Sequence, residues 1–261
     1  MAKSGVIGKL ERQISAGRCV LAAWIGTNDA SVAELLAREA YDAMVLDMQH
    51  GAIDVPGAIA GIAASALAGK PAIVRIPVGE FATASRVIDA GAAGVIAPMV
   101  NSASDARRFV EHMKFPPLGQ RSWGPRAALS LSGLVGPAYL HSANAFTLAI
   151  AMIETREALA ALDDILSVPG IDGVFVGPAD LSISLSAGGV VDAQSGAVEA
   201  ELDRIAARAK AHGKFAALFC FEGARARAMA ARGFLLCSVS TDQQLLRLAA
   251  RIELAAARDK S

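Results

Sequence analysis

Short apolar runs recur along the chain at fairly even intervals, and each has the length of a β-strand. They occupy residues 20–24, 44–47, 72–76, 94–98, 148–154, 173–177, 215–220 and 235–239. The segments between them show the periodicity of amphipathic helices, as in residues 31–40, 82–90, 156–166, 197–212 and 243–257. Buried strands that alternate with such helices are typical of a parallel sheet with helices on its faces.

The number of strands indicates how the sheet closes. Eight strand–helix units in a chain of 261 residues fit an α/β protein with the (β/α)₈ TIM-barrel fold, which takes about 250 residues. A doubly wound open sheet is the alternative, because a strand count made from one sequence is easily wrong. No proline-rich or serine-rich linker divides the chain, so residues 1–261 are interpreted as one domain.

Composition and charge narrow the choice of partner and compartment. The chain is 54% hydrophobic and carries 25 basic and 25 acidic side chains, which gives no electrostatic reason to expect nucleic acid or an anionic membrane as partner. No apolar stretch reaches the roughly 18 residues of a membrane span, and the N-terminal residues lack the apolar core of a signal peptide. The three cysteines are dispersed in apolar runs, which argues against a disulfide framework and favours the cytoplasm.

Two connections are too long for ordinary barrel loops: residues 114–147 and residues 178–196. Loops beyond about 12–15 residues are usually functional or disordered. The first is rich in side chains suited to recognition, namely Arg121, Trp123, Arg126, Tyr139 and His141. A binding role and simple packing against a neighbouring subunit are both compatible with this composition.

Four polar residues fall at or just after the ends of predicted strands: Asp47, Arg75, Glu154 and Asp180. The carboxyl ends of barrel strands share one face, where barrel enzymes assemble their active sites. Each residue alone has a structural explanation, since an acid can cap the following helix and an arginine can pair with any acid. Four of them converging on one rim favour a functional site.

The chemistry of these residue types fits together. Two carboxylates with no cysteine or histidine cluster make an oxygen-ligand site suited to Mg²⁺ or Mn²⁺, and such an ion can polarise a carbonyl. Arg75 could bind a carboxylate or stabilise an enolate oxygen, and His50 could accept a proton near neutral pH. This set suits carbon–carbon bond chemistry beside a keto group. No predicted strand contains a lysine, which argues against a Schiff-base mechanism.

At these residues the sequence resembles the HpcH/HpaI aldolase family, the metal-dependent class II pyruvate aldolases. The segments that carry the resemblance are YDAMVLDMQHG (41–51), PAIVRI (71–76), DAGAAGVIAPMV (89–100), FPPLGQRSWGP (115–125), MIETREAL (152–159) and IDGVFVGPADLS (171–182). The resemblance implies a (β/α)₈ barrel of the phosphoenolpyruvate/pyruvate type, assembled as a homo-hexamer in which the C-terminal helix is exchanged between subunits. It also implies reversible addition of pyruvate, or a related 2-oxo acid, to an aldehyde.

The resemblance implies a role for each polar residue at the strand ends. Glu154 and Asp180 match the ligands of a divalent metal, expected to be Mg²⁺, Mn²⁺ or Co²⁺. His50 matches the catalytic base, and Arg75 matches the residue that contacts the keto and enolate oxygen. The other matches are Asp47, an acid near the metal-bound waters, and the amides around Gly177, Pro178, Ala179 and Asp180, which hold the pyruvate carboxylate.

Asp89 matches the acid that partners the catalytic histidine in this family. It lies at the end of the helix predicted over residues 82–90, and that end of a barrel helix faces away from the carboxyl ends of the strands. Asp89 therefore cannot reach His50 of its own subunit, and the pair must form across a subunit interface. The alternative is that Asp89 closes the turn before the strand at residues 94–98.

Two positions depart from the commoner family pattern. Gln49 precedes His50 where many members have an acid, and Met152 stands where many have a glutamine. Gln49 removes a negative charge near the metal, and Met152 removes a hydrogen-bonding group from the substrate pocket. A subgroup of the family with both changes is linked with hydroxypyruvate as well as pyruvate, so both residues are expected to affect substrate binding.

Apolar residues near the predicted site have a separate expected role. Phe219, Phe221 and Val239 lie near the ends of their strands and could give the aldehyde an apolar wall. Trp24 is expected in the barrel core rather than on the pocket wall.

Two other functions stay open at this stage. A lyase of the malyl-CoA or citryl-CoA type would need a basic patch for the CoA phosphates, for which only Arg121 and Arg126 are candidates. A non-catalytic barrel would not need the complete set of Glu154, Asp180 and His50.

Overall fold

Eight parallel strands close into a barrel in this computed structural model, which describes residues 5–258. Each strand pairs with the next, and the last pairs with the first. The closed sheet confirms the predicted (β/α)₈ fold and excludes the doubly wound alternative. The strands are β1 Val20–Ile25, β2 Ala43–Asp47, β3 Ala72–Arg75, β4 Gly94–Ala97, β5 Leu148–Ile153, β6 Gly173–Val176, β7 Phe215–Leu218 and β8 Leu236–Thr241.

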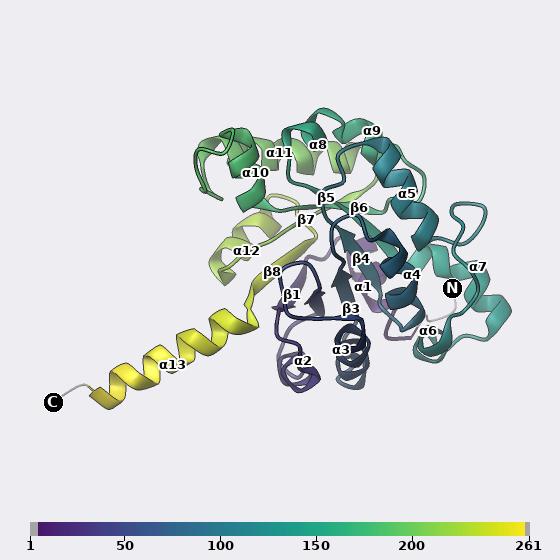
Figure 1. Cartoon of the computed structure of the whole chain (residues 1–261), viewed down its shortest axis with the longest axis horizontal. Helices are drawn as coiled ribbons and strands as arrows, with labels where there is room; N and C mark the ends of the chain where they lie inside the picture. The colour runs from purple at the N-terminus through teal and green to yellow at the C-terminus, as the bar shows by residue number, and fades with distance from the viewer. Residues whose placement is uncertain (1–4, 259–261) are drawn as a thin grey trace.

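Helices surround the barrel on its outer face (Figure 1). Those that follow the strands are α2 Ala30–Ala37, α3 Val55–Leu67, α4 Phe81–Asp89, α5 Ala103–Met113, α8 Arg156–Ala160, α9 Leu162–Leu166, α10 Pro178–Leu185, α11 Gly196–Ala211, α12 Gly223–Ala231 and α13 Asp242–Arg258. The remaining helices are α1 Lys9–Ser15, α6 Arg126–Ser132 and α7 Gly136–Phe146. Among residues 5–258 no helix combines the length and the apolar character needed to cross a membrane.

Short polar residues fix where several of these helices begin. Asp29, Asp54, Ser102 and Thr155 each accept a hydrogen bond from a backbone N–H in the first turn of the following helix. Such caps satisfy amide groups that have no partner inside the helix. Because each cap comes shortly after a strand, it fixes the chain at the carboxyl-end face of the barrel.

The strands are buried on both faces, which explains their continuous apolar runs. One set of side chains, including Val20, Ile73 and Phe175, fills the inside of the barrel. The other set, including Leu46 and Val74, packs between the strands and the surrounding helices. The barrel is therefore a filled core, and a ligand can enter only at its ends.

The connection over residues 114–147, interpreted from the sequence as a long loop, contains helices α6 and α7. It leads from a helix into β5, so it lies at the amino-terminal end of the barrel. Lys114 is fully buried there, and its Nζ donates to Asp172 Oδ2 at 2.7 Å and to the carbonyl oxygens of Asn144 and Thr147. This ammonium group joins the end of α5 to the starts of β5 and β6.

Helix α13 projects away from the barrel as an isolated arm (Figure 1). Asp242 is its single buried residue within the described part of the chain. Four large apolar side chains on the arm are more than half exposed: Leu246 (62%), Leu248 (54%), Ile252 (58%) and Leu254 (51%). A soluble single chain rarely exposes an apolar series of this kind.

Candidate active site

A cavity of about 290 Å³ opens at the carboxyl-end face of the barrel. The side chains that line it come from the ends of several strands and from the turns that follow them. Among them are Trp24, Asp47, His50, Arg75, Met152 and Asp180. Its position matches the end of the barrel where the sequence places the polar residues.

Asp47 and Arg75 face each other across the end of β2 and β3, where the two residues are register partners. Arg75 Nε donates to Asp47 Oδ1 at 2.8 Å, and Arg75 Nη2 donates to Oδ2 at 2.5 Å. Both side chains are buried, so this bidentate pair fixes the guanidinium with little screening by solvent. The remaining donors of Arg75 are free to point toward a bound anion or carbonyl oxygen.

The Asp47 carboxylate also binds three other donors. Trp24 Nε1 donates to Oδ2 at 3.1 Å, and the backbone N–H groups of Gln49 and His50 donate to Oδ1 at 3.0 and 3.3 Å. Burial would raise the pKa of Asp47, but the hydrogen bonds and charge of Arg75, with the N–H groups of Trp24 and Gln49, hold that pKa below its ordinary value. The carboxylate is therefore ionised near neutral pH.

Trp24 lies on the cavity wall as well as in the core. The Arg75 guanidinium carbon lies 4.9 Å from the centre of the Trp24 ring, within the range of a cation–π interaction. The other side of the indole packs against Phe175 and Phe219, with ring centroids 5.6 and 5.0 Å away. Trp24 lies in the barrel core, as favoured from the sequence, and it also lines the cavity, the alternative considered there.

Glu154 follows β5 directly and is buried, with one oxygen held by the backbone. The Met99 N–H donates to Glu154 Oε1 at 2.8 Å, from a residue whose φ of 54° lies in the left-handed region. A methionine rarely adopts this conformation, so the strain indicates that the turn after β4 is built around Glu154. This hydrogen bond leaves Glu154 Oε2 available for another partner.

Glu154 and Asp180 converge beside Gly177. A Cβ atom on Gly177 would lie 2.7 Å from Glu154 Oε2 and 3.6 Å from Asp180 Oδ2. Only glycine therefore fits between β6 and α10 without displacing the carboxylates. Burial raises the pKa of Glu154, and the charge of Asp180 adds to the rise, as expected for acids gathered without a cation.

The first turn of α10 supplies backbone amides to the same cavity. Pro178, Ala179 and Asp180 all line it, and Pro178 occupies the first helical position, where its missing N–H costs nothing. The amino-terminal end of a helix favours bound anions. The 2-oxo acid carboxylate can therefore lie against this turn, between the two carboxylates and Arg75.

His50 is exposed at the cavity wall in the turn that follows β2. The next residue allows this turn to close, because a Cβ atom on Gly51 would lie 2.3 Å from the Asp47 carbonyl oxygen. The His50 N–H bond to Asp47 fixes the backbone, whereas the ring stays accessible. His50 can thus exchange a proton with a ligand in the cavity.

The structure does not bring every residue proposed from the sequence to the cavity wall. Asp89 is the last residue of α4, at the opposite end of the barrel, and it does not line the cavity. Gln49 and Val239 are also absent from the wall, and Gln49 contributes its backbone N–H to Asp47 instead. Arg121 is likewise away from the cavity, since the connection that carries it lies at the amino-terminal end of the barrel.

Asp242 is the residue of this rim that the sequence reasoning missed. It is buried on the cavity wall and accepts hydrogen bonds from the N–H groups of Gly26 (3.1 Å), Thr27 (2.9 Å) and Gln243 (2.8 Å). It therefore ties the start of α13 to the turn after β1. The signal was present, because Asp242 is an acid that follows a strand, but the predicted strand ended too early.

The donor set can be tested against the chemistry of a divalent cation. Within residues 5–258 no group of three His, Cys, Asp or Glu side chains gathers around one point. Two convergent carboxylates with one free oxygen on Glu154 fit a hard ion that keeps its other positions for water and substrate, as Mg²⁺ does. The raised pKa of Glu154 and the close approach of the two carboxylates are in keeping with this assignment.

Comparison with known proteins identifies the relatives of this chain. The sequence model of the HpcH/HpaI aldolase/citrate lyase family matches residues 20–249. A hydroxypyruvate/pyruvate aldolase of Rhizorhabdus wittichii is 41% identical over 93% of this chain and 95% of its own length. A 4-hydroxy-2-oxo-heptane-1,7-dioate aldolase of Salmonella arizonae is 34% identical over 89% and 88%. The crystal structure of an HpcH/HpaI aldolase from Desulfitobacterium hafniense superposes with a TM-score of 0.88 over 97% of both chains, at 25% identity.

Proposed function

Because this chain belongs to the HpcH/HpaI aldolase/citrate lyase family, we infer that it is a carbon–carbon lyase of the class II aldolase type. It adds the enolate of a 2-oxo acid, pyruvate or hydroxypyruvate, to an aldehyde, and in reverse cleaves a 4-hydroxy-2-oxo acid. The observation that carries this proposal is the meeting of Arg75, His50 and Asp180 at one cavity. The Glu154 carboxylate is buried just behind the cavity wall, beside Asp180 at Gly177.

Glu154 and Asp180 would hold the divalent ion, as Mg²⁺, Mn²⁺ or Co²⁺. When bound, the ion supplies a Lewis acid that polarises the keto group of the 2-oxo acid. The buried position of Glu154 and the glycine at position 177 support this assignment. The chain's own residues bind and orient the 2-oxo acid and transfer its proton.

Arg75 binds the keto oxygen and stabilises the negative charge that develops there as the enolate forms. Asp47 holds the guanidinium in place through its two hydrogen bonds, so the donor is oriented before substrate binds. The amides at the start of α10 hold the substrate carboxylate. These contacts leave the methyl or hydroxymethyl carbon facing His50.

His50 takes a proton from C3 of the bound 2-oxo acid, and the electron pair of that C–H bond forms the enolate. The C3 carbon then attacks the carbonyl carbon of the aldehyde, and the aldehyde oxygen gains a proton. The opposite sequence cleaves the bond. Asp89 of a neighbouring subunit partners His50, since Asp89 of the same chain lies at the other end of the barrel.

Met152 is proposed to set the preference for the 2-oxo acid from the cavity wall, and Gln49 to contribute indirectly, through the turn that its backbone N–H ties to Asp47. The Met152 methyl group lies 3.0 Å from the position of a Cβ atom on Gly177, which places it beside the proposed carboxylate pair. A thioether removes a hydrogen-bonding group at this point. We expect the pocket to accept hydroxypyruvate in addition to pyruvate.

The thioester-lyase alternative loses its support in this structure. Arg121 is fully buried, and neither it nor Arg126 lines the cavity. The wall beside the cavity mouth is aromatic instead, because Phe219 and Phe221 stack edge to face with centroids 4.7 Å apart. The wall formed by these two rings offers no cation to the CoA phosphates.

The assembly is proposed to be a homo-hexamer in which α13 packs on a partner subunit. The projecting arm and its exposed leucine and isoleucine side chains support this proposal. Exchange of the arm would bury the apolar series without changing the barrel.

Exchange of the pyruvate methyl protons with deuterated water tests the proposed function directly. We expect exchange in the presence of Mg²⁺ or Mn²⁺, and a loss of at least about a hundredfold after EDTA treatment or in Glu154→Gln, because the keto group is no longer polarised. Readdition of the metal should restore the rate in the wild type and not in the variant. Exchange that is absent, or that is indifferent to EDTA, would show that the proposed function is wrong.

A further inference from the structure

A second polar cluster lies at the opposite end of the barrel from the cavity, and it consists of Asp89, Arg121 and Tyr139. The described residues contain six buried side-chain polar atoms with no hydrogen-bond partner, and five belong to this cluster. They are Asp89 Oδ1, the Tyr139 hydroxyl and all three nitrogens of the Arg121 guanidinium. Buried polar groups are normally satisfied, so a concentration of this kind needs a functional explanation.

The Arg121 side chain is completely buried, and its guanidinium carries a permanent charge. Its carbon lies 3.8 Å from the centre of the Phe115 ring, and its backbone N–H is held by the Lys114 carbonyl oxygen at 3.0 Å. The nearest carboxylate oxygen is Asp89 Oδ1, 4.0 Å from Nη1. A buried cation is costly without a counter-charge, and Asp89 is the acid positioned to supply one.

Asp89 does not act as a local structural acid. Its Oδ1 accepts no hydrogen bond from the described residues, and the turn before β4 is closed by Gly91, whose φ is 106° and whose N–H bonds to the Ile88 carbonyl. The Asp89 side chain is 26% exposed, so the carboxylate is reachable from outside the chain. Oδ1 is buried on the side of the guanidinium, so the exposure of the side chain belongs to the rest of the carboxylate.

We propose that Arg121 is a positioning residue for Asp89, and that it keeps this carboxylate ionised and directed outward to receive His50 of the partner subunit. This inference rests on the proposed aldolase function. At 4.0 Å the guanidinium stabilises the anion through space from the side of the buried Oδ1, and this leaves Oδ2 to receive an imidazole N–H.

The groups around Asp89 are few. Arg121 comes from the connection after α5, and Tyr139 comes from α7. The other elements at this end of α4 present apolar side chains, Leu131 from α6 and Ile62 from α3, against Gly91. Burial raises the pKa of Asp89 and the charge of Arg121 opposes that rise, so loss of Arg121 leaves burial unopposed.

Substitution of Arg121 tests the proposal through the pH profile of pyruvate methyl-proton exchange. Arg121→Gln should lower the exchange rate about tenfold. It should also move the acid limb upward by about one pH unit, because protonation of the Asp89–His50 pair becomes easier without the nearby cation. Arg121→Lys, which keeps the charge, should recover part of both effects. Arg126→Gln is the matched control, since Arg126 is exposed five positions along the same connection, and it should leave the profile unchanged.

Several results would overturn the proposal. A wild-type pH profile in Arg121→Lys and Arg121→Gln, with only a lower stability to urea, would show a purely structural role. If Arg121→Gln fails to fold, Arg121→Met, which removes the charge and keeps an unbranched side chain, takes its place, and an unshifted acid limb in that variant decides against the proposal. In an Asp89→Asn background, Arg121→Gln should cost nothing further, and a full additional loss would contradict action through Asp89.

The proposal and the aldolase function fail in different ways. Wild-type exchange that is metal-dependent but insensitive to Asp89→Asn leaves the aldolase intact and removes the role of Arg121. Wild-type protein without any metal-dependent exchange removes the aldolase function itself.

Discussion

At the residue scale, Trp24 combines packing with electrostatics. Its ring fills the top of the barrel interior, its N–H group binds Asp47, and its face lies beside the Arg75 guanidinium. The indole therefore contributes to two contacts that orient one arginine. An aromatic residue without the N–H would keep the packing and lose the hydrogen bond to the carboxylate.

Trp24→Phe separates these contributions. We expect kcat/KM for pyruvate to fall about tenfold, because a hydrogen bond to a charged group contributes about 1.5 kcal/mol. The loss should appear mainly in KM, since Arg75 then binds the 2-oxo acid from a less fixed position. Steady-state kinetics with pyruvate and a test aldehyde measure it.

Tyr41→Phe is the control for this substitution. It also removes one aromatic donor, whose bond to the Val239 carbonyl oxygen is 3.3 Å long, and Tyr41 does not line the cavity. Its kinetics should match those of the wild type. Equal losses in the two variants would mean that Trp24 acts through general stability alone.

The residues of the site differ in how far the sequence could reveal them. Asp47, Arg75, Glu154 and Asp180 could be placed because they follow apolar strands whose ends share one face. The nearness of Arg121 to Asp89 could not, because it depends on how α7 and the preceding turn fold back under the barrel. Asp242 was missed because β8 ends in polar residues, so the apolar run that predicts the strand stops before the strand itself does.

At the element scale, the strands were predictable and some helices were not. Each strand is buried on both faces and so reads as an unbroken apolar run. Helices α6, α7 and α10 are short and carry many Gly, Pro and Ser residues, which conceal the helical period. The ends of two of these helices carry the usual signals nonetheless. Helix α6 ends at Gly133, whose φ of 67° is left-handed, and α7 has a proline in its first turn.

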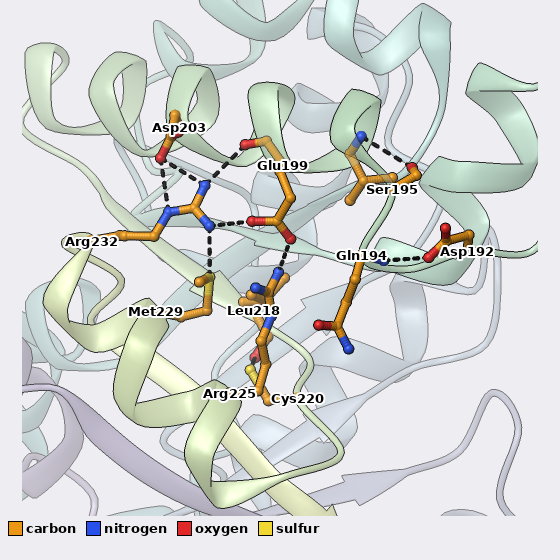
Figure 2. Close-up of polar contacts among 11 residues, drawn as sticks. Asp192, Gln194, Ser195, Glu199, Asp203, Leu218, Cys220, Arg225, Met229 and Arg232 are labelled. Carbon is orange, nitrogen blue, oxygen red and sulfur yellow. Dashed lines mark hydrogen bonds and ion pairs between the residues drawn. The ribbon is translucent and has the colours of Figure 1, made fainter.

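An ion-pair network joins α11 to α12 and supports the last part of the barrel wall. Glu199 in α11 accepts hydrogen bonds from both Arg225 and Arg232, and Arg232 also bonds to Asp203 (Figure 2). Burial would raise the pKa of Glu199, but the hydrogen bonds and charges of the two arginines hold it below its ordinary value of 4.5. A group whose pKa is lowered by folding stabilises the fold above its ordinary pKa and loses this contribution as the pH falls through the lowered value.

Glu199→Gln should therefore destabilise the protein at about pH 7 and destabilise it less at about pH 4, because part of the contribution of Glu199 is lost once the pH falls below its ordinary pKa. Urea unfolding at the two pH values measures the difference from the wild type. Glu201→Gln is the control, because Glu201 pairs with Arg204 on the surface of the same helix and such a pair contributes about 0.5 kcal/mol or less. A Glu199→Gln effect that grows as the pH falls would contradict this account.

At the scale of the whole molecule, the barrel separates two groups that the proposed chemistry needs together. His50 lies at the carboxyl-end face, whereas Asp89 lies at the other end. If Asp89 partners His50 as proposed, a single chain is incomplete and assembly is a condition for proton transfer. The exposed arm of α13 gives the chain a means of binding its neighbours.

Mixed assemblies test this condition. Subunits with Asp89→Asn and subunits with His50→Ala should each be nearly inactive alone. When they are co-expressed in equal amounts, about a quarter of the sites receive an intact pair from two different chains, and activity should return to about that level. Aldol cleavage assays on the purified mixture measure it.

A second mixture serves as its control. His50→Ala with Glu154→Gln should not recover, because both residues belong to one chain's cavity. Failure of the first mixture, with mixed assemblies verified by mass spectrometry, would place Asp89 outside the reaction.

The five hydrogen bonds that converge on Asp47 constrain how this enzyme can change under selection. The same carboxylate fixes Arg75, the proposed substrate-binding arginine, and the turn that carries His50, the proposed base. We therefore expect a mutation there to disturb substrate binding and proton transfer together. Met152 and Phe221 also line the cavity, but they fix neither Arg75 nor the turn that carries His50. New substrate preferences are therefore open to mutation at these two positions while the Asp47 cluster is kept, and libraries for directed evolution should begin with them.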